Sequence, residues 1–281
     1  MSNGRGGGGQ PGLIWLREEP GARRAAHSRA EIASVAVAIA DEEGFDAVSM
    51  RRVAQALGAG TMTLYHYVRN KDELLTLMHD AVMGEVLVPE GELPEGWRAA
   101  MTSIALRSRA SFQRHPWTLD RVSDTAAGPN GVRHFEQSLE AMESAGLPVE
   151  ERLHVLSLVD EYVFGFTLRE TIDFVPEEDG ADFLWPAETL EFFQRELDTG
   201  AYPHINALFE DEEIGAGGDA NEGVRRIVAM ISRPERFEHG LAQLLDGVEA
   251  GMARPPGKRN GAGRRAPRKP AAAAATARAS G

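Results

Sequence analysis

The stretch SMRRVAQALGAGTMTLYHYVRNKDELL, residues 49–75, constrains the fold more than any other part of the chain. Ser49 is suited to cap a helix, and Val53 and Leu57 lie four residues apart on its expected buried face. Gly58 tolerates the left-handed backbone that commonly ends a helix. A second short helix is expected after this turn. Two helices joined by a short turn with glycine are typical of a helix-turn-helix, whose second helix enters the DNA major groove.

The segment before this motif predicts a third helix. Ile32, Val35, Ala36 and Ile39 recur at helical spacing, and the pattern stops at Gly44. Three short helices would therefore share one small core.

The second helix of the motif supplies candidate DNA contacts. Leu64 and Val68, four residues apart, are expected to face the core, so the other side chains face solvent or DNA. Hydroxyls and cations suit contacts with phosphates and base edges. The candidates are Thr61, Thr63, Tyr65, His66 and Tyr67 in this helix, Arg51 early in the preceding helix and Lys71 at the head of the next one. The alternatives are that Tyr65 and Tyr67 close the small core and that His66 is an ordinary surface histidine.

TLYHYVRNKDELL resembles the recognition helix of the TetR family of transcriptional regulators, followed by the start of its linking helix. The resemblance extends back through SRAEIASVAVAIADEEGFDAVSMRRVAQALG and covers roughly residues 28–80. It implies that Lys71 touches the DNA backbone and that the groove-facing and phosphate-facing positions are held by Thr61, Thr63, Tyr65, His66 and Tyr67. It also implies an all-α repressor that binds a palindromic operator as a homodimer and is released by a small-molecule effector.

Charge is divided unevenly along the chain. Residues 1–87 carry 9 basic and 11 acidic side chains, residues 88–252 carry 13 and 32, and residues 253–281 carry 8 basic and no acidic ones. The formal net charge of -13 thus comes from the central region and does not exclude an N-terminal DNA-binding face. Operator affinity is expected to depend on a dimer's doubled contacts and to fall steeply with salt.

Composition excludes several classes of site and location. The chain has no cysteine, so disulfides, thiolate catalysis and cysteine-bound metals are excluded. It has no apolar run near the roughly 20 residues that span a bilayer, and its glycine-rich start lacks a signal core. We expect a cytoplasmic protein without a cofactor or metal ion.

Composition also divides the chain. We expect a flexible extension over 1–27, a DNA-binding domain with its linking helix over 28–87, a helical domain for effector binding and dimerisation over 97–252, and a disordered basic tail over 253–281. In the extension, Leu13–Leu16 form an apolar patch that could pack on the domain. Arg23 and Arg24 suit either an arm reaching a neighbouring DNA groove or a solvated linker.

The second domain reads as helical throughout. Helices are expected at 97–114, 118–126, 131–145, 150–174, 187–199 and 234–251, with an acidic, glycine-rich loop over 210–221. Two of them carry apolar stripes suited to a dimer interface, or else to an internal core. The stripes are Leu153, Leu156, Val159, Val163 and Phe166 within 150–174, and Phe237, Leu241, Leu244 and Val248 within 235–249. FEHGLAQLLDGV resembles the last helix of TetR-like regulators, which implies a four-helix interface between two subunits.

Aromatic and polar residues of this domain predict an effector cavity, because small-molecule sites are apolar with a few polar groups. The candidates are Phe112, His115, Trp117, His154, Glu161, Tyr162, Thr167 and Trp185. The alternative is that they form ordinary core. By resemblance, aligning on Gly165, Arg169 stands where the tetracycline-responsive member has a carboxylate near its magnesium. This difference argues against a tetracycline–magnesium effector and suits an anionic or neutral one, unless Arg169 forms a surface ion pair with Glu170 or Asp173.

Two other functions compete with this interpretation. An enzyme would need a nucleophile, phosphate-loop, dinucleotide or metal motif, and the chain has none. The runs of acidic residues are typical of solvent-exposed surfaces. The second competitor is a DNA-binding dimer that responds to no effector. A ligand that raises the melting temperature would distinguish it from an effector-controlled regulator.

Overall fold

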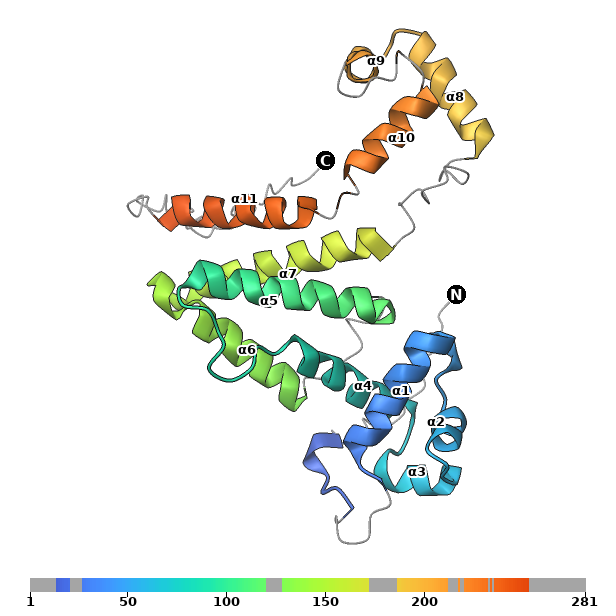
Figure 1. Cartoon of the computed structure of the whole chain (residues 1–281), viewed down its shortest axis with the longest axis vertical. Coiled ribbons are helices and arrows are strands. Elements are labelled where there is room, and N and C mark those ends of the chain that lie inside the picture. Colours follow the sequence, from blue (N-terminus) through green and yellow to red (C-terminus); the bar gives the residue numbers. More distant parts are fainter. Residues whose placement is uncertain are drawn as a thin grey trace, which may run out of the picture.

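The structure is a computed structural model that describes residues 14–20, 27–119, 128–171, 186–211, 217, 220–231, 233 and 235–252. Every regular element in these ranges is helical, which confirms the all-α fold (Figure 1). The α-helices are α1 (Arg29–Glu43), α2 (Met50–Ala56), α3 (Thr61–Tyr67), α4 (Lys71–Val86), α5 (Trp97–Arg114), α6 (Pro129–Ala141), α7 (Val149–Thr171), α8 (Ala187–Asp198), α9 (Pro203–Glu210), α10 (Ala220–Ile231) and α11 (Glu235–Met252). Single 3₁₀ turns are η1 (Ile14–Leu16), η2 (Phe45–Ala47) and η4 (Glu143–Ala145).

Local signals in the sequence set the ends of the first helices. Ser28, Ser49 and Asn70 each accept a hydrogen bond from the backbone N–H three residues later, and so cap α1, α2 and α4. Gly58 has a φ of 66°, and the next N–H, of Ala59, donates to the carbonyl of Ala54 at 2.9 Å. This left-handed cap ends α2 and turns the chain into α3.

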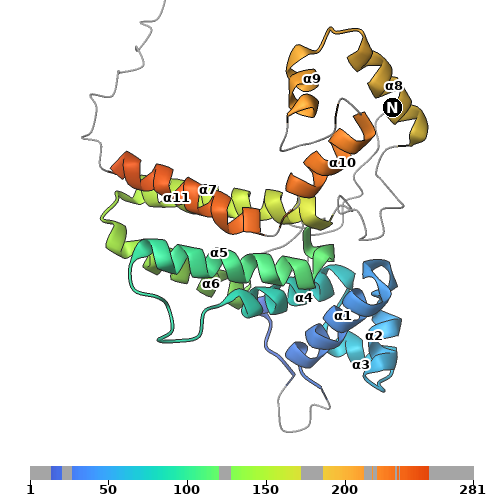
Figure 2. The ribbon, with the colours of Figure 1, turned by 45° about the horizontal axis from the view of Figure 1, so that its top comes forward.

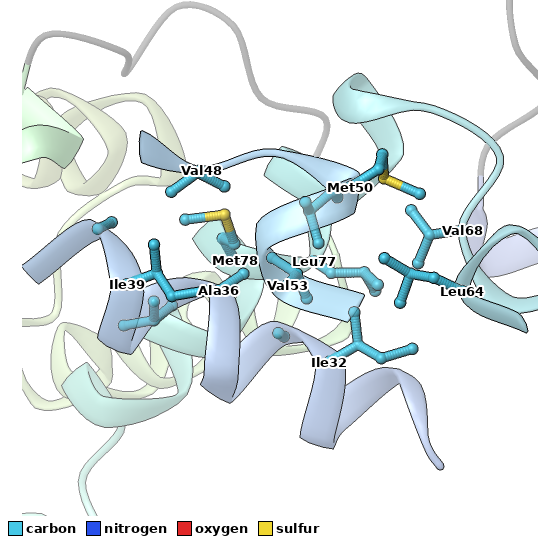
Figure 3. Packing of buried hydrophobic residues seen from close by; sticks show 14 of the residues in the cluster. Ile32, Ala36, Ile39, Val48, Met50, Val53, Leu64, Val68, Leu77 and Met78 are labelled. Atoms are coloured by element: carbon cyan, nitrogen blue, oxygen red, sulfur yellow. The ribbon is translucent and has the colours of Figure 1, made fainter. Parts of the chain in front are cut away.

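The N-terminal domain packs around one small core (Figure 3). Ile32, Val53 and Leu64 come from α1, α2 and α3, and each is almost fully buried. Leu77 and Met78 of α4 close the same core. The first part of α4 therefore belongs to the N-terminal domain and shares its core with α3.

The second domain has a separate core, built mainly by α5, α7 and α11, which lie side by side in both ribbon views (Figure 2). Leu156, Val159 and Val163 of α7 and Phe237 and Leu241 of α11 are buried in it. Most of the two apolar stripes expected at a dimer interface thus pack inside one protomer, because α7 and α11 pack against each other.

The helices α8, α9 and α10 form a satellite of the main body. Their own small core contains Leu197, Phe209, Val224 and Val228, and both views show α8 and α9 standing away from the main body (Figures 1 and 2). The sequence interpretation placed no helix over α9 or α10. Most of the helix expected over 118–126 lies outside the described residues.

The segment 14–20 is not a free extension: the packing on the domain that the apolar patch allowed is found for Ile14. Ile14 is 2% exposed and packs into the N-terminal core. The guanidinium of Arg17 donates to both carboxylate oxygens of Glu73, at 2.9 and 2.8 Å, and to the carbonyl of Tyr67 at 2.7 Å. Arg29 donates to the carbonyls of Ile14 and Arg17. The segment is therefore bonded to the end of α3 and the start of α4.

Candidate DNA-binding surface and ligand cavity

The face of α3 turned away from the core carries most of the expected DNA contacts. Tyr65 is 42% exposed, His66 is also exposed, and Thr61 and Thr63 are half-buried. Arg51 lies exposed at the start of α2. Met62, which the sequence interpretation left out, is 75% exposed on the same helix. Its place three and four residues before Tyr65 and His66 was the available signal.

Tyr67 does not belong to this face. Its side chain is 4% exposed and packs in the N-terminal core, and its hydroxyl accepts a 3.4 Å hydrogen bond from the backbone N–H of His27. It lies three residues after Leu64, on the buried side of α3, so the core-packing alternative describes it and the expected DNA contact does not.

Lys71 starts α4 at the edge of this surface. Its side chain is exposed, and its ammonium lies 5.4 Å from the ring centre of Phe45. An ammonium over an aromatic face is held by a weak attraction that leaves its donors free for an anion such as a phosphate.

The corner after α5 joins the two domains. The buried His115 places Nδ1 2.9 Å from Oδ1 of Asp41 in α1 and Nε2 3.2 Å from Oε2 of Glu85 in α4. The indole of Trp117 donates to Oδ1 of Asp41 at 2.9 Å and stacks on Phe45 at 5.7 Å. The expectation that His115 and Trp117 line an effector cavity is thus wrong. Their partners come from far away in the sequence and hold α5 against the DNA-binding domain.

Polar contacts also fix the outer part of α4. Arg107 of α5 donates to the carbonyls of Glu85, Val86 and Leu87, which lie at the end of α4 and lack partners within the helix. The buried Asp80 accepts from the N–H groups of Asn130 and Gly131, at 2.9 and 3.2 Å, at the start of α6. Burial raises the pKa of Asp80 although both N–H groups oppose the shift.

A cavity of about 420 Å³ opens between α4, α5, α6 and α7. Of the expected effector contacts, Phe112 and Glu161 line it. The other lining residues, missed in the sequence, are Met83, Val86, Ser108, His134, Asp160, Val163 and Phe164. Met83 and Val86 belong to α4, so the helix that closes the DNA-binding core also forms a wall of this cavity.

The surroundings shift the pKa values of two titratable groups in this cavity. Burial, and then the neighbouring charge of Glu161, raise the pKa of Asp160 to about 6. Asp160 and Glu161 are both exposed side chains in the lining of this cavity. Burial lowers the pKa of His134, and its Nδ1 atom is buried without a hydrogen-bond partner among the described residues.

The remaining expected contacts lie elsewhere. His154 lines a second cavity, of about 700 Å³, between the start of α7 and the end of α11. Tyr162 donates to the carbonyl of Phe237 at 2.9 Å, and the fully buried Thr167 donates to the carbonyl of Val163 at 2.8 Å. Trp185 lies outside the described residues. The expected convergence of these side chains on one site is therefore not found in the described part of the chain.

Arg169 is exposed and lines none of the described cavities, and Glu170 pairs with Arg109 instead. The described helices include none that is both long and apolar enough to cross a membrane. Within the same residues, no group of three histidine, aspartate or glutamate side chains is placed to hold a metal ion.

Two family models cover most of the chain. Residues 32–78 match the model of bacterial regulatory proteins of the tetR family, and residues 90–252 match the tetracyclin repressor-like C-terminal domain. The HTH-type transcriptional repressor DrrR1 of Streptomyces coeruleorubidus is 34% identical over 79% of this chain and 77% of its own length. The class E tetracycline repressor of Escherichia coli is 28% identical over 50% and 67% of the two chains.

Solved structures agree with these matches. The TetR family protein ActR of Streptomyces coelicolor, in complex with (S)-DNPA, superposes with a TM-score of 0.59 and 28% identity, covering 81% of this chain and 99% of ActR. ActR in complex with actinorhodin gives a TM-score of 0.57 and 29% identity over 80% and 96% of the two chains. DrrR1 and the class E protein are repressors, and ActR is a TetR family protein. The second helix of the helix-turn-helix, α3, is called the reading helix below. Because both family models match, this chain belongs to the TetR family of bacterial transcriptional regulators.

Proposed function

We propose that this protein is a repressor that binds a palindromic operator as a homodimer and is released by a small molecule held between α4, α5, α6 and α7. The observation that carries the proposal is the double role of α4. Leu77 and Met78 pack under the reading helix, and Met83 and Val86 line the cavity one to two turns further on. A ligand that moves the outer part of α4 must therefore tilt α3.

DNA is read, in this proposal, by the exposed face of the helix-turn-helix. Tyr65, His66, Thr61 and Thr63 reach the groove or its phosphates, and Arg51 and Lys71 contact the backbone on either side. DrrR1 is a transcriptional repressor, which supports the operator-binding part of the proposal, and ActR in complex with (S)-DNPA supports the ligand-binding part. The effector-independent alternative is disfavoured because a large cavity adjoins the connecting helix.

Dimerisation is assigned to the outer edges of α7 and α11. Val149 and Leu153 of α7 are 58% and 40% exposed, and Leu244 and Val248 of α11 line the neighbouring 700 Å³ hollow. A two-fold pairing of these edges buries apolar surface that one protomer leaves open. It must place the two α3 helices roughly 34–36 Å apart, one turn of DNA.

The test is selection of bound duplexes from a random DNA pool by the purified protein, read by sequencing. We expect one enriched palindrome with half-site centres about 10 base pairs apart, or a small multiple of that spacing. A Tyr65→Ala/His66→Ala variant that remains dimeric is the control and must lose the enrichment. Failure of the wild-type protein to enrich any sequence, even at low salt, would contradict the proposal.

A further inference from the structure

The cavity between α4, α5, α6 and α7 has an unbalanced charge. Asp160 and Glu161 are neighbours on α7, and both line the cavity, whereas no arginine or lysine is among the lining residues that the structure describes. The lining from α4 and α5 is Met83, Val86, Ser108 and Phe112, which carry no charge. Among the described lining residues, the only other titratable group is His134 of α6.

His134 does not neutralise the two carboxylates. Burial lowers its pKa, so the imidazole is uncharged near neutral pH. Its Nδ1 atom has no hydrogen-bond partner in the described part of the chain. A buried polar atom without a partner is costly, and a ligand that hydrogen-bonds to it removes this cost.

Nearby arginines are held by other groups. Arg109 bonds to Glu170 and lies 4.6 Å from the ring centre of Phe237. Arg107 donates to the three carbonyls at the end of α4. Neither side chain turns into the cavity, so the negative potential of Asp160 and Glu161 is left for a ligand.

The remaining walls are apolar and aromatic. The rings of Phe112 and Phe164 meet edge to face with their centres 6.3 Å apart. Aromatic rings attract cations through their faces and also accept flat apolar groups. Two carboxylates at one side of an aromatic-lined cavity are complementary to an organic ammonium ion rather than to an anion.

We propose that this cavity selects an organic cation, an aromatic or other apolar body carrying a protonated amine, with Asp160 and Glu161 as the counter-charge and His134 as a neutral hydrogen-bond partner. The assignment rests on the proposed effector role of the cavity and narrows its ligand class. It replaces the anionic or neutral ligand expected from Arg169, which lies outside the cavity.

The test uses three probes of one shape and different charge: 2-(1-naphthyl)ethylammonium, 2-(1-naphthyl)ethanol and 1-naphthylacetate. Their binding to the DNA-free protein is measured by titration calorimetry near pH 7.5. We expect the ammonium probe to bind at least about tenfold more tightly than the alcohol, and the acetate most weakly. Equal affinities, a preference for the acetate, or no binding of any probe would overturn the inference.

Variants locate the charge effect. Asp160→Asn and Glu161→Gln should each weaken ammonium binding several-fold and leave alcohol binding unchanged. Glu151→Gln, on the same helix but lining the other cavity, is the matched control and should change neither. Near pH 6 the wild-type protein should release protons on binding the ammonium probe, because the ligand favours ionised Asp160. Full retention of ammonium affinity in both cavity variants would contradict the assignment.

The DNA selection separates this inference from the proposed function. If a palindrome is enriched but the ammonium probe is not preferred, the organic-cation proposal is refuted and the repressor proposal stands. If the ammonium probe is preferred but no palindrome is enriched, the repressor proposal is refuted and the cation-binding site stands.

Discussion

The indole Nε1 of Trp117 donates a 2.9 Å hydrogen bond to Oδ1 of Asp41, and this bond ties the end of α5 to the end of α1. His115 bonds to the same carboxylate, and Trp117 stacks on Phe45, whose ring lies under the ammonium of Lys71. A continuous set of contacts thus runs from the corner after α5 to a side chain at the DNA-binding surface.

Asp41→Ala tests this junction. The substitution leaves the donors of Trp117 and the nearly buried His115 without their carboxylate, so we expect a loss of about 1–3 kcal/mol in the free energy of unfolding. Urea denaturation measures it. Asp46→Ala, which removes an exposed carboxylate from the adjacent 3₁₀ turn, is the control and should change stability little. Equal small effects would mean that the junction adds nothing to stability.

Two tyrosines two residues apart should behave in opposite ways. Tyr65→Ala removes a 42% exposed side chain and should reduce operator affinity while leaving the melting temperature nearly unchanged. Tyr67→Ala removes a buried one and should destabilise the protein by about 3–5 kcal/mol, as large-to-small changes in cores do. Fluorescence anisotropy with a labelled operator and thermal denaturation report the two effects. A reversed pattern would show that the exposed face of α3 is assigned incorrectly.

Lys71→Ala should weaken binding to every DNA sequence to a similar extent. If its ammonium contacts a phosphate, the slope of log affinity against log salt should become shallower by about one unit per subunit. Operator affinity measured over a salt series gives this slope. Lys71→Arg keeps the charge and should keep the salt slope. A similar loss of DNA affinity in both variants would mean that Lys71 supports the fold and does not contact a phosphate.

The raised pKa of Asp160 predicts how stability depends on pH. Because its folded pKa, about 6, lies above the ordinary value of 3.8, the folded state binds more protons than the unfolded state between these limits. The contribution of Asp160 to stability is therefore greatest below about pH 4 and is lost as pH rises through about 6. Asp160→Asn should lack this dependence. Unfolding curves of both proteins at matched pH values check it, and parallel pH profiles would rule it out.

Local signals made the DNA-binding domain predictable. The caps Ser49 and Asn70, the left-handed Gly58 and the buried Leu64 act within one or two helical turns, so the sequence displays them directly. The exposed face of α3 followed from the same spacing. Tyr67, three residues after Leu64, lies on the buried side by this spacing, so its expected DNA contact went against the local signal; its hydroxyl accepts a hydrogen bond from the backbone N–H of His27, 40 residues away.

Long-range pairing explains the errors in the second domain. Trp117 and His115 look like cavity aromatics until Asp41, more than 70 residues earlier, is placed beside them. Asp160 gave no local signal either, because its role depends on the helices α4, α5 and α6 that face it. The stripes on α7 and α11 fit an interface and a core equally well, and only their mutual packing decides between the two.

The central claim is that filling the cavity releases the operator, and the absence of cysteine allows a direct measurement. Ser108→Cys places a single thiol in the cavity lining, where a benzyl methanethiosulfonate reagent can attach an apolar group. The labelled protein should lose operator affinity by about tenfold or more, and a reducing agent should restore it. Thr189→Cys, exposed on α8, is the labelled control and should bind normally. Unchanged operator affinity after complete labelling at Ser108→Cys would contradict the coupling of this cavity to the reading helices.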